Sequence, residues 1–231
     1  MFVTCVLSLL AYALGSIPTG YLLVRARHGV DIRRFGSRNV GAINVLSVGG
    51  PGLGILTLLC DAAKAFVAVV FVHLSTSSSW TTSVVALAVM TGHAYSGWFY
   101  LKERRFSEGK SVACGLGVIV GVAVFGGWAW YVAALPLAVW LMGLGVPRLL
   151  TGRWFPVSLA TMTATLSLPI AALVSGTEPA YMVLSLSMAG LILIRHKNNL
   201  RRLFDGSEPS LDERLRAPRL SRGRGPVACS R

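Results

Sequence analysis

Residues 31–47 form the stretch of the chain whose side chains are best suited to binding an anion. It lies between two long apolar segments, and Gly36 and Gly41 allow its backbone to approach a ligand closely. Neutral hydrogen-bonding groups come from Ser37, Asn39 and Asn44, and positive charges come from Arg33, Arg34 and Arg38. This combination suits phosphate. The alternative is a connector loop whose arginines only fix the orientation in a membrane, and that alternative does not account for the two asparagines and the serine.

Two further polar groups fall inside apolar segments. Asp61 and Lys64 are three residues apart, so they share one face of a helix and can form an ion pair. They fit a ligand site and a structural ion pair that orients the adjacent loop equally well. His93 follows Gly92 in another apolar segment, shortly before a basic loop. A lone histidine in a membrane often only bonds a neighbouring helix, but the approach to this loop also favours a role in substrate binding.

The basic loop at 102–111 ends in Gly109, Lys110 and Ser111 and leads into the next apolar segment. Free backbone N–H groups at the start of a helix, together with the ammonium group of Lys110, can bind an anion. A nucleotide-binding P-loop would need a glycine five residues before Gly109, and Arg104 occupies that position. The loop therefore excludes a nucleoside triphosphatase of this kind.

His196 and Asn199 form the last polar pair, at the end of the final apolar segment. Their spacing places them on one helix face, where both can contact the ligand of the 31–47 stretch. The alternative is a basic membrane anchor. It explains Arg201 and Arg202 but gives no reason for a histidine and an asparagine one turn apart.

The composition is that of an integral membrane protein. Of the 231 residues, 54% are hydrophobic and only 13% are charged, and the mean hydropathy is +0.64. The net charge of +13 would suggest nucleic acid on a folded basic surface, but the basic residues lie in short loops and a tail. The four cysteines are far apart, with no histidine at ligand spacing, so the sequence indicates no metal site and no cofactor.

Apolar segments of spanning length predict an all-α protein with seven transmembrane helices. The predicted spans are 2–24, 51–74, 80–101, 112–127, 128–147, 156–175 and 179–195, the first being a retained helix rather than a signal peptide. All lysines and arginines except Lys64 fall in alternate loops or the tail, which places the N-terminus outside and the C-terminus in the cytoplasm. Residues 1–204 form one transmembrane domain, and residues 205–231 form a polar, basic tail that we expect to be mostly disordered, without a catalytic role.

The sequence contains no Ser-His-Asp arrangement, no paired carboxylates and no Asp-rich metal motif. Chemistry at this site would therefore rest on positioning and electrostatics, which suits group transfer from a donor that is already activated.

Together the motifs resemble the bacterial acyl-phosphate-dependent glycerol-3-phosphate acyltransferases (PlsY type) over most of residues 5–208. The resemblance rests on several motifs in the family's order. They are Gly15-Ser-Ile-Pro-Thr19, Asp31-Ile-Arg33, Gly36-Ser-Arg-Asn-Val-Gly-Ala-Ile-Asn44, Asp61 with Lys64, Gly92-His93, Gly109-Lys110 with Val112-Ala113, and the run from His196 to Glu208.

The resemblance implies transfer of an acyl chain from acyl phosphate to the 1-hydroxyl of glycerol 3-phosphate, giving lysophosphatidic acid and phosphate for phospholipid synthesis. It implies a bacterial inner-membrane enzyme with a cytoplasm-facing site, without metal, nucleotide or nucleic acid, and with membrane lipids around it. Residues 107–112 would cradle the acyl phosphate, and the donor's own phosphate would accept the hydroxyl proton. The implied substrate-binding set is Ser37, Arg38, Asn39, Gly41, Asn44, Asp61, Lys64, His93, Gly109, Lys110, Ser111, His196 and Asn199.

The chain departs from the family pattern chiefly at the expected donor site. Ile43 stands where the family usually has threonine, Ser47 where it has arginine and Ser96 where it has proline, and residues 103–106 look inserted. Glu108 would place a carboxylate beside an anionic donor, which is unfavourable unless a neighbouring arginine neutralises it. Two other functions stay open: a membrane protein that binds glycerophosphates or phospholipid without turnover, and a small transporter of phosphorylated solutes.

Overall fold

The chain is built from helices. The computed structural model describes residues 1–104, 109–216 and 219–220, and these contain no strand. The elements are α1 (Phe2–Ser16), α2 (Thr19–His28), the 3-10 helix η1 (Ile32–Arg34), α3 (Ala42–Gly49), α4 (Pro51–Thr76), α5 (Ser79–Ala94), α6 (Gly97–Glu103), α7 (Val112–Phe125), α8 (Trp130–Thr151), α9 (Val157–Val174), α10 (Pro179–Arg195), α11 (Lys197–Phe204) and α12 (Leu211–Arg216).

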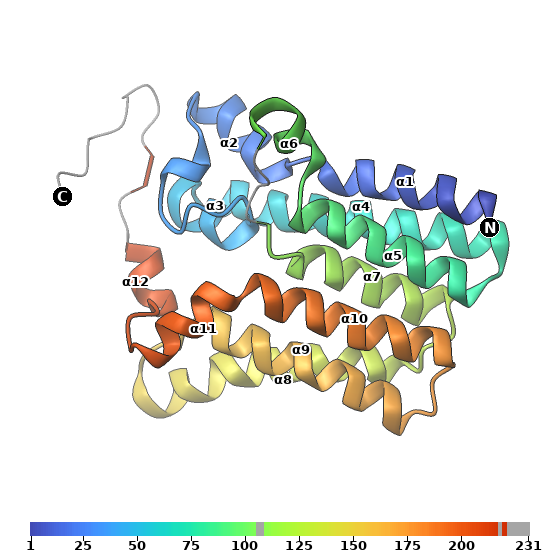
Figure 1. Ribbon diagram of the computed structural model, residues 1–231. Helices are drawn as coiled ribbons and strands as arrows, with labels where there is room; N and C mark the ends of the chain where they lie inside the picture. Colours follow the sequence, from blue (N-terminus) through green and yellow to red (C-terminus); the bar gives the residue numbers. More distant parts are fainter. Residues whose placement is uncertain (105–108, 217–218, 221–231) are drawn as a thin grey trace.

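The long helices lie side by side, and the short ones gather toward one end (Figure 1). Helix α1 packs on α5, α4 packs on α7, and α9 packs between α8 and α10. Helices α2, α3, α6, α11 and α12 lie toward the end away from the N-terminus (Figure 1). Most of the polar motifs of the sequence are on these short elements or on the loops beside them, so the fold collects them at one end of the bundle.

The outer surface of the bundle is apolar. Leu9, Phe71 and Leu173 expose 71%, 61% and 71% of their surface, while smaller apolar residues such as Val69 and Val89 are fully buried. In water such a surface would be unfavourable, because apolar area is stabilised by removal from water. In a lipid bilayer it faces hydrocarbon, so the arrangement is that of a multi-pass membrane protein.

The structure does not confirm seven spans. By length and composition, four segments of the described chain can cross a membrane: α1 with α2 (Phe2–His28), α4, α8 and α9. A fifth is present if α10 and α11, which meet at a 60° bend, count as one span. Helices α5 and α7 have only 16 and 14 residues. At about 1.5 Å per residue, 14 residues cover roughly 21 Å, which is less than a hydrocarbon core of about 30 Å.

The predicted continuous helix over 80–101 is wrong. Helix α5 ends at Ala94, and α6 begins at Gly97. Ser96 Oγ donates to the Ser16 carbonyl at 2.6 Å, and the N–H of Gly97 donates to Ser16 Oγ at 3.1 Å. These bonds fix the break against the end of α1, about eighty residues away in sequence, so the apolar pattern of the segment could not show it.

The described part of the tail contains a short helix. Residues 211–216 form helix α12, and the N–H of Leu220 donates to the Val48 carbonyl at 2.9 Å. Contacts with the bundle compensate for the low apolar content of this part, and the expectation that residues 205–231 are mostly disordered stays a prediction. Residues 105–108, 217–218 and 221–231 lie outside the described residues, so the structure does not test the expectation there.

Candidate active site

A pocket of about 420 Å³ opens between the helices and reaches the loop-bearing end of the bundle. It is lined by ten of the residues singled out from the sequence: Ser37, Asn39, Gly41, Asn44, Asp61, His93, Lys110, Ser111, His196 and Asn199. Arg38, Lys64 and Gly109 are not among the lining residues. The volume falls in the range of sites for small organic ligands.

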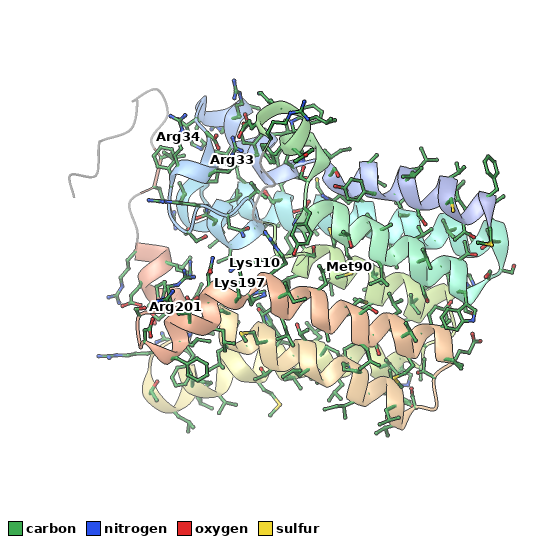
Figure 2. All side chains as sticks on the ribbon, in the orientation of Figure 1. Arg33, Arg34, Met90, Lys110, Lys197 and Arg201 are labelled. Atoms are coloured by element: carbon green, nitrogen blue, oxygen red, sulfur yellow. The ribbon has the colours of Figure 1, made fainter. Side chains whose placement is uncertain are left out.

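The pocket has two chemically different parts. We call the part formed by Ser37, Lys110, His196 and Asn199 the polar end. A second part, the apolar body, is lined by side chains of α4, α7, α8 and α9, including Leu58, Leu116, Ile119, Leu137 and Leu168. Figure 2 shows Lys110 in the same half of the molecule as Arg33, Arg34, Lys197 and Arg201, whereas Met90 lies further along the bundle. A ligand with an anionic head and an apolar chain fits both parts at once.

Asn44 holds the loop that forms one side of the polar end. Its Oδ1 accepts from the N–H of Ser37 at 2.9 Å, and its Nδ2 donates to the carbonyls of Asn39 at 2.7 Å and Phe35 at 3.2 Å. Asn39 Oδ1 in turn accepts from the N–H of Gly41 at 2.7 Å. The amide of Asn44 is thus committed to the loop backbone, a positioning role that the sequence pattern did not distinguish from direct phosphate binding.

Gly36 is required by this arrangement. Its φ of +54° is in the left-handed region, and a Cβ at this position would lie 2.3 Å from Asn44 Oδ1. Arg38 also has a positive φ, 60°, which is strained for a residue with a side chain. Arg38 is exposed and does not line the pocket, so the structure gives it no place in the polar end.

Lys110 and Asn199 form the opposite side of the polar end. Lys110 Nζ donates to Asn199 Oδ1 at 2.7 Å, and Asn199 Nδ2 donates to Glu208 Oε1 at 2.7 Å. The Gly109 carbonyl accepts from Arg195 Nε at 2.8 Å, which ties the loop before α7 to the end of α10. These bonds join the loop before α7 to the segment from Arg195 to Glu208, although the two are almost ninety residues apart in sequence.

Glu208 is the common hydrogen-bond acceptor on the Lys110 and Asn199 side of the polar end. Its buried carboxylate receives hydrogen bonds from Ser158, Asn199, Arg202 and Arg214 at distances of 2.7–3.0 Å. Burial opposes ionisation, but the hydrogen bonds from Arg202, Asn199 and Ser158 prevail and lower the pKa of Glu208 below its ordinary value. The carboxylate is therefore ionised at neutral pH and holds both arginines close to the pocket.

His196 lies at the 60° bend between α10 and α11. The side chain is buried, and Nδ1 is 2.8 Å from the Ile192 carbonyl. A carbonyl accepts only from a protonated nitrogen, so we assign the proton of the neutral ring to Nδ1, which makes Nε2 an acceptor. The bend thus presents a histidine of fixed orientation to the pocket.

Asp61, Lys64 and His93 form a buried cluster where α4 meets α5. Lys64 Nζ is 2.8 Å from Asp61 Oδ1, 3.1 Å from His93 Nδ1 and 3.0 Å from the Ile17 carbonyl. Asp61 and His93 line the pocket. Their ligand atoms and the sulfur of Cys114 lie within 4.8 Å of one another, a grouping that could hold a metal ion. The ammonium group of Lys64 already supplies positive charge beside Asp61 and His93.

Residues 5–206 match the sequence model of the family described as Glycerol-3-phosphate acyltransferase. The chain belongs to this family. A glycerol-3-phosphate acyltransferase of Synechococcus sp. (strain JA-3-3Ab) is 36% identical over 203 residues, which are 88% of this chain and 91% of the relative. One from Geotalea daltonii is 37% identical over 199 residues, covering 86% of this chain and 92% of the relative.

Two solved structures of family members share the fold. The glycerol 3-phosphate form of PlsY (YgiH), an integral membrane glycerol 3-phosphate acyltransferase, has a TM-score of 0.77 and 33% identity, with 90% of this chain and 94% of that chain covered. The form of the same enzyme with lysophosphatidic acid has a TM-score of 0.76 and 32% identity, covering 92% and 98% of the two chains. The family membership confirms the resemblance inferred from the motifs.

Some functional groups of this acyltransferase were not recognised from its sequence. Glu208 closes the last family motif, but its role as the common acceptor depends on Ser158 in α9 and Arg214 in α12. Hydropathy could not identify the apolar body, because residues that face a pocket and residues that face lipid are equally apolar. The expected acyl-phosphate cradle at 107–112 lies partly outside the described residues, which begin again at Gly109.

Proposed function

We propose that the protein transfers an acyl chain from acyl phosphate to the 1-hydroxyl of glycerol 3-phosphate, as the family membership and the site chemistry indicate. The observation that carries the proposal is the union of a polar end and an apolar body in one pocket. An acyl phosphate has the same two parts. The reaction gives lysophosphatidic acid and inorganic phosphate and needs no metal or nucleotide.

In the proposed reaction the 1-hydroxyl oxygen attacks the carbonyl carbon of the donor. A new ester bond forms, the bond between that carbon and the phosphate oxygen breaks, and the departing phosphate takes the hydroxyl proton. The protein's task is to hold the two anionic substrates together and to neutralise their charge. Positioning of this kind can lower a barrier by about 7–11 kcal/mol.

The residues of the polar end have distinct proposed roles. Lys110 neutralises phosphate charge, and the hydroxyl of Ser37 offers a neutral donor on the opposite side. His196, with its proton on Nδ1, presents Nε2 to a substrate hydroxyl. We place Asp61 and His93 at the wall of the pocket, where Lys64 pairs with them from outside the lining and the cluster keeps α4 and α5 in register beside the ligand.

We further propose that seven helical segments cross the bacterial inner membrane, with the N-terminus outside and the site facing the cytoplasm. They are α1 with α2, α4, α5, α7, α8, α9 and α10. The distribution of lysine and arginine supports this orientation, and local thinning of the bilayer would accommodate α5 and α7. This orientation can be tested with two variants of a cysteine-free protein, one carrying Ser78→Cys and the other Lys197→Cys. A membrane-impermeant maleimide should label position 78 in intact cells and position 197 only after permeabilisation; the reverse pattern would contradict the orientation.

The activity can be tested with the purified protein in detergent. Palmitoyl phosphate and glycerol 3-phosphate should give equimolar phosphate and lysophosphatidic acid. Lys110→Ala and His196→Ala should each reduce the rate about 100-fold, because each removes a group from the polar end. Lys197→Ala is the matched control, since Lys197 is exposed beside His196 and does not line the pocket.

Absence of product would contradict the proposal if acyl-CoA and acyl carrier protein donors also failed. Retained binding of glycerol 3-phosphate would then identify a binding protein, and its flux across sealed vesicles without chemical change would identify a transporter. A rate that survives both Lys110→Ala and His196→Ala would show that the reaction takes place elsewhere.

A further inference from the structure

Helix α12 is anchored beside the pocket by specific contacts at its beginning. Asp212 Oδ2 accepts from the N–H of Trp154, in the turn between α8 and α9, at 2.8 Å. Leu211 packs against the cluster formed by Leu144, Val157 and Ala160. These contacts set the helix at the same end of the bundle as the polar end of the pocket (Figure 1).

The opposite side of the pocket also contacts this part of the chain. Helix α12 lies against α3, and the N–H of Leu220 bonds the Val48 carbonyl of that helix. Leu220 packs on the apolar cluster of α2 and α3 that includes Val24 and Val45. The described residues of the tail therefore touch both flanks of the site: the α8–α9 turn and the end of the 31–47 stretch.

Arg214 is the residue that α12 brings into the pocket. It lines the cavity, its side chain is only 12% exposed, and one terminal nitrogen donates to Glu208 Oε1 at 3.0 Å. A guanidinium has five N–H donors arranged to match phosphate oxygens, so this single bond leaves donors for a ligand. Arg214 lies beyond residue 206, where the match to the family model ends.

The charges around Glu208 favour an anion at this place. Arg202 is paired with Oε2 at 2.7 Å, and Arg214 with Oε1, so one carboxylate faces two guanidinium groups. Lys110 joins the same network through Asn199. The group of three cations and one carboxylate has an excess of positive charge that a phosphate would neutralise.

We propose that Arg214 is a phosphate-binding residue of this site, delivered to the pocket by α12. The inference rests on the acyltransferase function proposed above and extends it to a segment outside the family match. The phosphate is that of glycerol 3-phosphate or of the acyl phosphate donor. Arg214 would hold it from the side opposite to the loop of residues 35–44.

The test is a steady-state comparison of Arg214→Gln and Arg214→Lys with the unmodified protein. Arg214→Gln should raise the KM for one of the two substrates about tenfold with kcat within about twofold, because a charge-assisted hydrogen bond to the bound phosphate is lost. Arg214→Lys should recover part of that loss. The substrate whose KM rises identifies the phosphate, and inhibition by inorganic phosphate should weaken in parallel.

Two matched variants separate ligand contact from a structural effect. Arg216→Gln removes the same charge from the exposed side of α12 and should leave both KM values unchanged. Arg202→Gln removes the other cation paired with Glu208, but Arg202 does not line the pocket, so its effect on KM should be smaller than that of Arg214→Gln. Equal effects of Arg202→Gln and Arg214→Gln would overturn the proposal, as would unchanged KM values in a folded Arg214→Gln protein.

Binding measurements keep this inference separate from the proposed activity. If the unmodified protein has no turnover, the acyltransferase function fails, and equilibrium binding of radiolabelled glycerol 3-phosphate and of inorganic phosphate still tests Arg214. Affinity lowered about tenfold in Arg214→Gln, but not in Arg216→Gln, would support the assignment. Equal affinity of the unmodified and Arg214→Gln proteins for both probes would overturn it.

Discussion

The two sides of the polar end are held in different ways. On one side, residues 35–44 are fixed by neutral hydrogen bonds in which the Asn44 amide bonds to three backbone groups. On the other, Lys110, Asn199 and Glu208 are joined by a network that includes charged groups and side chains from α9 and α12. We call the first the neutral side and the second the charged side. The neutral side is held by contacts within one segment, whereas the charged side depends on how distant helices pack.

Under the proposed function, the two sides would bind phosphate in different ways. Neutral bonds within a loop give a rigid backbone surface whose geometry is insensitive to ionic strength or pH. The cations on the other side already have a carboxylate partner, so a ligand competes with Glu208 for them instead of meeting bare charges. In the reaction proposed above, rigid shape on one side and shared charge on the other would position the substrates tightly without making release of phosphate slow.

Asn44→Asp should break the neutral side and produce the largest effect. The carboxylate can still accept from the Ser37 N–H, but it repels the carbonyls of Asn39 and Phe35, to which the amide donates. We expect a loss of about 2 kcal/mol in the free energy of unfolding and a rate reduced about 100-fold by the displaced loop. Thermal unfolding and initial rates measure the two effects.

Asn198→Asp is the control for this substitution, because Asn198 is exposed on α11. It makes the same chemical change and should alter neither quantity. Normal activity in Asn44→Asp would show that the loop does not need its internal hydrogen bonds and would remove the contrast between the two sides.

Glu208→Gln should weaken the charged side. We expect its effect on stability to be smaller than that of Asn44→Asp and to depend on pH. Because the pKa of Glu208 is lowered in the folded protein, its carboxylate stabilises the fold at neutral pH. This stabilisation is lost as the pH falls through and below about 4.3, the ordinary glutamate pKa. The melting temperature of the unmodified protein should therefore fall more steeply between neutral and acidic pH than that of Glu208→Gln.

Adding inorganic phosphate to the same melting experiment tests whether the arginines freed from Glu208 bind an anion. Without the carboxylate, Arg202 and Arg214 lack their anionic partner, so inorganic phosphate should raise the melting temperature of Glu208→Gln more than that of the unmodified protein. Asp205→Asn is the control, because Asp205 is exposed and 3.9 Å from Arg201. Parallel pH profiles for the unmodified protein and Glu208→Gln would mean that the network contributes nothing to stability.

The sequence predicts an anion site at the loop but gives no sign of the network on the other side. The glycines, serine and asparagines of residues 36–44 act within one loop, so their types and spacing already indicated an anion site. Glu208 gains its role from Ser158 and Arg214, whose positions depend on how α9 and α12 pack. No periodicity in residues 205–216 distinguishes a helix docked on the bundle from a solvated basic tail.

The fold shows the same limit. Apolar runs predicted an all-helical membrane protein and the break at Gly126 and Gly127, because these depend on local composition. They did not predict the end of α5 at Ala94, which is set by the bonds of Ser16 with Ser96 and Gly97. Hydropathy counts apolar residues but contains no information on long-range polar contacts, so the lengths of α5 and α7 had to come from the structure.

Arg33 joins the loop of the neutral side to α6. Among all the substitutions proposed, a change at Arg33 should disturb this loop least. Its guanidinium makes two 2.8 Å bonds to Glu103, pairs with Asp31 at 2.7 Å and lies 4.2 Å from the centroid of the Phe99 ring. Burial opposes ionisation of Asp31, but the bonds from Arg33 prevail and lower its pKa. These contacts lie outside the pocket, so they can act on the site only by fixing where the loop begins.

Arg33→Lys keeps the charge but loses the planar, forked contact. We expect a destabilisation of less than about 1 kcal/mol, because the pair is partly exposed, with a KM for glycerol 3-phosphate raised about twofold. Arg34→Lys, at an exposed neighbour, is the control and should change neither. If Arg33→Lys reduced the rate as much as Asn44→Asp, the loop would depend on its link to α6 rather than on its own hydrogen bonds, and the neutral side would be no more local than the charged one.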